Sequence, residues 1–174
     1  MRLSTRGQLR SVLAPLVLVA VLIGGCATSI PGTGTTSDGV RENVAPSDLE
    51  IVGSGEQDVD VLARNALADI QTFWTEQFPD VFGEDFTPLA GGIYSIDPAE
   101  FDPASYPEEI GCLDNPADVA NNAFYCFPQP GGGGDNIVYD RTLLQSLAAD
   151  YGRFIPALVM AHEFGHTVQG RVPP

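Results

Sequence analysis

An apolar, helix-compatible run near the end of the 174-residue sequence constrains the fold most strongly. Pro156 suits the first turn of a helix, where its missing N–H costs nothing, and Gly170 favours the end of one, so the pattern predicts a helix over residues 155–169. Apolar side chains lie on most of its sides: Ile155, Leu158, Val159, Phe164 and Val168. A helix of this kind is expected at the buried centre of a domain. Gly165 lies inside it despite a propensity cost of about 1 kcal/mol, which indicates that something packs close to the backbone there.

His162 and His166 are four residues apart in this helix, and Glu163 follows the first of them. The i, i+4 offset places both imidazoles on one face, where two ring nitrogens can converge on one tetrahedral zinc ion. Glu163 is then placed to act as general base on a water activated by the metal. The alternative is a pair of ordinary polar histidines at the boundary of a core, but unpaired imidazoles are costly in a helix this apolar. The His-Glu-x-x-His spacing is typical of zinc peptidases and therefore predicts peptide hydrolysis.

Several stretches of the sequence resemble the bacterial neutral zinc metallopeptidases, a family of secreted or lipid-anchored proteins. The resemblance lies in the helix motif over 162–169, in Phe124-Tyr125-Cys126 with the segment 136–140, and in Phe73-Trp74 with Phe86-Thr87-Pro88. It extends from about Asp58 to Gln169. The resemblance implies an α+β fold, the N-terminal portion of a zincin-like metallopeptidase domain with a buried HExxH helix. It also implies that Zn²⁺ is bound by His162 and His166, and that Glu163 is the catalytic base.

The third protein ligand of the metal is not part of this motif. Catalytic zinc sites usually have three protein ligands and a water, and in such families the third is a Glu on a later helix. No carboxylate follows Glu163 in the sequence. Asp140 and Asp150 precede the helix and are candidates to replace it, although an Asp at the end of a strand is more often a turn or helix cap. We therefore expect the chain to be the N-terminal portion of a longer peptidase, inactive alone, whose third zinc ligand is unknown.

Residues 1–25 have the pattern of a lipoprotein signal peptide. Three arginines precede an apolar run over 12–23, and two glycines follow it. The run is too short for a membrane-spanning helix, which needs about 20 apolar residues. Leu22 to Cys26 resembles a lipobox, in which Cys26 is lipidated and starts the mature protein, the alternative being a plain secretory signal with an incidental cysteine. We expect export and a lipid anchor at the cell membrane, on its extracytoplasmic side.

Cys112 and Cys126 remain as a pair once Cys26 is assigned to lipid. Export permits a disulfide between them, which would stabilise the fold by roughly 3 kcal/mol. The alternative, zinc binding by these thiols, fits less well because their spacing is not that of a C-x-x-C site.

The charge of the chain is strongly negative. The formal net charge is −15, and all eight basic residues are arginines, three of which belong to the signal peptide. This composition argues against nucleic acid and anionic lipid surfaces as partners. A solubilising acidic surface is the simple explanation, and an electrostatic preference for basic peptides is the alternative.

The rest of the sequence divides into a linker and one folded part. Residues 26–57 hold the lipidated cysteine and a stretch rich in Gly, Ser, Thr and Pro, which predicts a flexible linker. Residues 58–174 are the incomplete metallopeptidase domain. Its expected elements are a helix over 59–78 stopped by Pro79, an alternating strand over 91–96, a surface loop over 97–109, a strand over 136–139 and a helix over 141–150. By resemblance, the strand at 136–139 lies beside the cleft and can pair with substrate backbone.

The sequence therefore favours an exported, lipid-anchored zinc peptidase that acts on a peptide or protein substrate and has no nucleic-acid partner. A non-catalytic envelope lipoprotein, with a degenerate peptidase domain that binds a partner or acts as a scaffold, is the alternative, and the missing third ligand motivates it. The oligomeric state and the cleavage specificity do not follow from the sequence. We also expect aggregation, because so apolar a helix exposes much of its surface if a packing half is missing.

Overall fold

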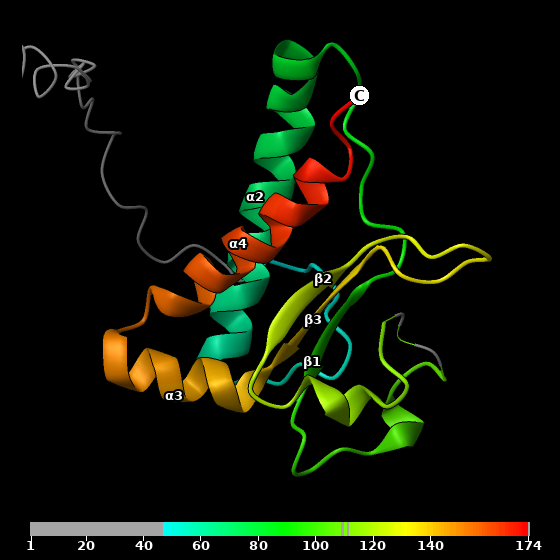
Figure 1. The fold of residues 1–174 in the computed structure, drawn as a ribbon. Helices are drawn as coiled ribbons and strands as arrows, with labels where there is room; N and C mark the ends of the chain where they lie inside the picture. Colours follow the sequence, from blue (N-terminus) through cyan, green and yellow to red (C-terminus); the bar gives the residue numbers. More distant parts are fainter. Residues whose placement is uncertain (1–46, 109, 111, 174) are drawn as a thin grey trace, which may run out of the picture. The chain divides into compact units, whose positions relative to one another are not determined.

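Three α-helices and a three-stranded sheet make up the described part of the chain, so the predicted α+β class is confirmed (Figure 1). The computed structural model describes residues 47–108, 110 and 112–173. The elements are α2 (Asp58–Phe82), β1 (Ile93–Ile96), the 3₁₀ turns η1 (Pro103–Ser105) and η2 (Pro116–Val119), β2 (Ala123–Cys126), β3 (Asn136–Asp140), α3 (Arg141–Tyr151) and α4 (Ile155–Gln169). The predicted signal peptide over 1–25 and the lipidation of Cys26 lie outside these residues. Within them, no helix has the length and apolar character needed to cross a bilayer.

The strand β3 lies at the centre of the sheet, whose order is β1-β3-β2. It pairs in parallel with β1, where Ile93 lies opposite Ile137, and antiparallel with β2, where Tyr125 lies opposite the same residue. Both edges of β3 are therefore used, and the expectation that this strand pairs with substrate backbone is wrong. All five residues of β3 are buried, which is typical of a central strand. The neighbouring edge strand β2 packs against α4.

Both faces of the sheet are buried. Ile137 and Tyr139 point to a core shared with the helices, which includes Leu67 and Phe164. Val138 points to the opposite face, into a second cluster of buried residues: Tyr94, Ile96, Ile110, Val119 and Val138. The predicted alternation of the first strand therefore does not produce a solvent-exposed face, because the loops that carry η1 and η2 supply residues that cover it.

The helix α2 continues beyond Pro79, which was expected to stop it. Pro79 removes one intrahelical hydrogen bond, to the carbonyl of the residue four positions earlier. The added turn is held by aromatic contacts of Phe82 with Phe78 and Trp74, at ring-centroid distances of 4.6 and 6.4 Å. Gly83 ends the helix in the left-handed conformation (φ 79°), where its N–H donates to the Pro79 carbonyl at 2.9 Å. Trp74 is partly buried and packs against the core cluster, which agrees with the packing role that was predicted for it.

The predicted linker is too long at its C-terminal end, because residues before Asp58 already belong to the folded part. Val52 pairs in parallel with Tyr94, and its N–H and C=O bond the backbone of Ile93 and Ser95, both at 2.9 Å. Ile51 is only 5% exposed. Ile51 and Val52 are too few apolar residues to produce a periodic pattern in a Gly- and Ser-rich stretch. They are nevertheless enough for Val52 to pair with the edge strand β1.

The helices α3 and α4 follow their predicted boundaries closely, and their ends carry the expected signals. Pro156 lies in the first turn of α4 and Gly170 is its C-cap. Asp140 is the N-cap of α3, where its carboxylate accepts hydrogen bonds from the Thr142 N–H at 2.8 Å and from the Asn121 N–H at 2.8 Å. Burial alone would raise the pKa of Asp140, but these hydrogen bonds outweigh it and hold the pKa below its usual value.

Replacing Asp140 by alanine is expected to lower the free energy of unfolding by about 1–2 kcal/mol, because it removes the cap of α3. Urea unfolding followed by circular dichroism measures this. The matched control is Asp102→Ala, which removes a cap from the exposed three-residue turn η1. Equal losses of unfolding free energy in the two variants would contradict the assignment of Asp140 as the cap that stabilises α3.

Candidate metal centre

The helix α4 is buried on one side only. It packs along α2 and against β2 (Figure 1), and its buried residues are Pro156, Met160, Glu163, Phe164, Thr167 and Val168. The opposite side is open among the described residues, where Leu158 is 56% exposed. The expectation of a fully buried helix is therefore wrong for this part of the chain. So is the expectation of close packing at Gly165, since a Cβ there would meet no described atom within 4 Å beyond the local helix backbone.

His162 and His166 lie side by side on α4, with ring centroids 4.9 Å apart and ring planes at 84°. His162 is exposed and His166 is half-buried. The Nδ1 of His166 lies 2.9 Å from the Gln169 Oε1. If Nδ1 carries the proton it donates to this amide oxygen, and Nε2 keeps a free lone pair for a metal. Gln169 is thus a residue of the site that motif spacing alone did not assign, although it lies one turn beyond His166.

Glu163 is buried at the contact between α4 and the sheet. It is 6% exposed, and its Oε2 accepts a hydrogen bond from the Tyr125 N–H of β2 at 2.9 Å. Burial raises the pKa of Glu163, while the nearby His162 imidazole and this hydrogen bond oppose the rise. A carboxylate with a raised pKa, held beside two imidazoles, has the properties of a general base.

Within the described ranges, no strand pairs with the outer edge of β2, which lies beside Glu163. Successive residues of an antiparallel strand turn their N–H and C=O groups to alternate sides. The Asn122 C=O accepts from the Asp140 N–H at 2.9 Å and so faces β3, whereas the Tyr125 N–H faces Glu163. Ala123 and Tyr125 therefore direct their backbone groups away from β3. Because the Tyr125 N–H already donates to Glu163, an extended peptide can add backbone hydrogen bonds here, and not at β3, only through the Ala123 N–H and C=O and the Tyr125 C=O.

A buried cluster, which we call the clasp, joins the end of α4 to β2 and consists of Asp135, Tyr125 and Arg171. The Asp135 carboxylate accepts from the Tyr125 hydroxyl at 2.6 Å and from Arg171 Nη2 at 2.9 and 3.0 Å. It also accepts from the Ala90 N–H at 2.9 Å, and the Arg171 guanidinium lies 5.5 Å from the ring centroid of Phe86. Tyr125 thus donates to Glu163 through its backbone N–H and to Asp135 through its side-chain hydroxyl.

A third metal ligand does not come together with the histidines among the described residues. No group of three or more His, Cys, Asp or Glu side chains in those ranges could hold a metal ion. Asp140 is engaged as the cap of α3, and Asp150 lies exposed on the same helix without joining such a group. Two neighbouring imidazoles, one of them oriented by Gln169, fit two of the ligands that zinc takes. The fit to a catalytic zinc site is therefore partial.

Cys112 and Cys126 lie at disulfide-bonding distance, with Cα atoms 5.9 Å apart. The pairing agrees with the prediction and leaves neither thiol for the metal. Because Cys126 is in β2 next to Tyr125, the bond ties the open-edged strand to the loop that precedes η2.

No family model, curated protein or solved structure matches the chain.

Proposed function

We propose that the chain belongs to a zinc-dependent peptidase of the zincin-like kind, exported and lipid-anchored through Cys26. One observation carries the proposal: a pair of neighbouring imidazoles and a buried carboxylate occupy one helix, beside a strand edge that no described strand pairs with. An ordinary histidine pair at a core boundary does not require a buried acid next to it.

His162 and His166 would hold Zn²⁺, which when bound supplies Lewis acidity to a water and to a peptide carbonyl. Glu163 takes the proton from the attacking water and passes it to the leaving amine. The Tyr125 N–H holds one oxygen of Glu163, so that the carboxylate keeps a single orientation on the buried side of α4. The outward backbone groups of β2 orient an extended peptide beside this acid.

We further propose that the third zinc ligand comes from residues outside the described ranges or from a second copy of the chain. The absence of a third ligand among the described residues also favours one alternative, a non-catalytic envelope lipoprotein that uses the domain to bind a partner. The exposure of His162 fits both cases, since a ligand or a partner surface would cover it.

Zinc stoichiometry and affinity decide between these functions. We expect one zinc per chain in the oxidised protein without a histidine tag, lost in His166→Ala. Gln169→Ala should weaken binding by about 10- to 100-fold, because it removes the partner that orients His166. Isothermal titration with a competing chelator measures both effects. Weak or absent zinc binding, or binding that survives in His166→Ala, would overturn the assigned ligands and favour the non-catalytic alternative.

A further inference from the structure

The exposed side of α4 carries an apolar stripe that leads into the histidine pair. Phe154, Leu158 and His162 follow one another at intervals of four residues, which places them on one face of the helix. Phe154 is 61% exposed and Leu158 is 56% exposed within the described ranges. An added Cβ at Gly165, one turn beyond His162, would meet no described atom within 4 Å beyond the local helix backbone. Large apolar side chains exposed beside two candidate metal ligands are typical of an interaction surface.

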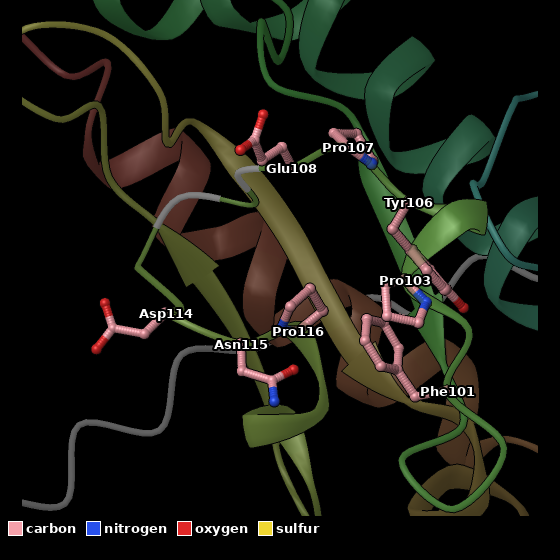
Figure 2. A pocket seen from close by; sticks show the side chains of 8 residues that line it. All are labelled: Phe101, Pro103, Tyr106, Pro107, Glu108, Asp114, Asn115 and Pro116. Carbon is pink, nitrogen blue, oxygen red and sulfur yellow. The ribbon is translucent and has the colours of Figure 1, made fainter.

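The exposed side of α4 is also free of acidic side chains. Glu163 is the only acid among residues 154–169, and it is buried. Figure 2 shows a contrasting surface, a pocket of about 590 Å³ where Phe101 and Tyr106 pack on the second buried cluster, on the side of the sheet away from the helices. The exposed carboxylates of Glu108 and Asp114 lie at the margins of this pocket. Copies of a chain with a formal net charge of −15 repel each other over such acidic surfaces, so the exposed side of α4 is where two copies can approach.

The histidine pair supplies half of the ligands that a closed zinc site needs. Structural zinc sites are almost always tetrahedral, with four protein ligands. The described residues bring no third carboxylate, thiolate or imidazole to His162 and His166. When protonated, Nδ1 of His166 donates to the Gln169 amide oxygen at 2.9 Å and leaves Nε2 for an ion. A two-fold axis through that ion adds the same pair from a second copy, because an isologous interface uses one face twice. A partner of another kind would need both an uncharged face and two further ligands, which a second copy already has.

We propose that the exposed side of α4 binds a second copy of this chain, and that one zinc ion is held in the interface by His162 and His166 of both copies. The apolar stripes of the two copies are buried in the same interface, which adds hydrophobic stabilisation to the metal bonds. Zinc bound by four imidazoles has no open position for a catalytic water. The dimer is therefore a latent form, and a chain must leave it before its site can act on a peptide. This dimer rests on the zinc ligands of the proposed function but not on its peptidase activity.

The test is native mass spectrometry of the full chain without a histidine tag, prepared metal-free and titrated with zinc. We expect the fraction of dimer to be largest at one zinc per two chains, and the mass of the dimer to include one ion. In a large excess of zinc each chain takes its own ion and the dimer dissociates by mass action, which agrees with one zinc per chain at saturation. A chain that binds zinc but stays monomeric at every ratio would overturn the dimer and leave the zinc ligands in place. A chain that binds no zinc would overturn the proposed function together with the dimer.

The matched variants are Phe154→Glu and Val81→Glu, which place one acid on the exposed side of α4 and one near the end of α2. Both side chains are 61% exposed, so both variants keep the fold. Residue 154 is about 12 Å along the helix from His162, too far for the new carboxylate to bind the same ion. Phe154→Glu should weaken the dimer by about tenfold, because the two-fold axis brings both new charges into one interface, while zinc binding at saturation is kept. Val81→Glu should form the dimer as the wild type does. Equal dimer formation by the two variants, or a dimer that forms without zinc in His166→Ala, would overturn the zinc-bridged interface.

Discussion

Replacing Glu163 by glutamine is expected to reduce peptide hydrolysis by about 100- to 10,000-fold while zinc binding is kept, because the amide cannot accept the proton from the attacking water. Glutamine has nearly the same shape, and its Oε1 can still accept the hydrogen bond from the Tyr125 N–H. The fold and the orientation of β2 should therefore be unchanged. A fluorogenic peptide library measures the loss, assayed with the zinc-loaded protein in a form in which the third ligand is present.

The comparison variant is Glu163→Ala, which removes the proton acceptor and also leaves the buried Tyr125 N–H without a partner. It should abolish hydrolysis to the same extent and, in addition, lower the free energy of unfolding by about 1–3 kcal/mol. A catalytic role predicts that the two variants differ in stability only. Retained hydrolysis in Glu163→Gln would contradict the role of this residue as general base. A zinc-loaded wild type that cleaves no peptide would favour the non-catalytic binding function.

The parts of the fold that the sequence predicted well are those controlled by local chemistry. The boundaries of α4 follow from Pro156 and Gly170, and the start of α3 follows from Asp140, because a cap acts within one helical turn. The neighbouring position of His162 and His166 is also a local consequence of the 3.6-residue period. Pro79 shows the limit of such signals, since aromatic contacts across one turn outweigh the loss of a single hydrogen bond.

The parts that the sequence did not predict depend on contacts between distant residues. The hydrophobicity of the sequence shows that α4 is apolar, but it does not show which side of the helix is buried. The buried side is the one that packs against α2 and β2. The bond from Tyr125 to Glu163 spans 38 residues of sequence. Asp60 is likewise fully buried in a helix that looks ordinary, where it accepts from the hydroxyls of Ser95 and Tyr139, both at 2.7 Å. Local patterns do not contain such pairings.

Replacing Asp135 by asparagine is expected to lower the free energy of unfolding by about 3 kcal/mol at pH 7, because it leaves the largely buried Arg171 side chain without its counter-charge. Asparagine tolerates the positive φ of this position (54°), so the backbone adds no strain of its own. The matched control is Asp58→Asn, which removes the acid of the exposed ion pair with Arg153 and should change stability little. Guanidinium unfolding of both variants measures the difference.

The effect of Asp135→Asn should also depend on pH, in a direction that its surroundings determine. Burial alone would raise the pKa of Asp135, but the hydrogen bonds from Tyr125, Ala90 and Arg171 outweigh it and lower the pKa below its usual value. A lowered pKa means that the stabilisation is complete above the unfolded-state pKa of about 3.9 and is lost as the pH falls through the folded-state value. Wild type and variant should therefore differ fully at pH 7 and converge below about pH 4. A difference that stays constant between pH 7 and pH 3 would mean that packing, and not the charge of the clasp, holds the end of α4 against β2.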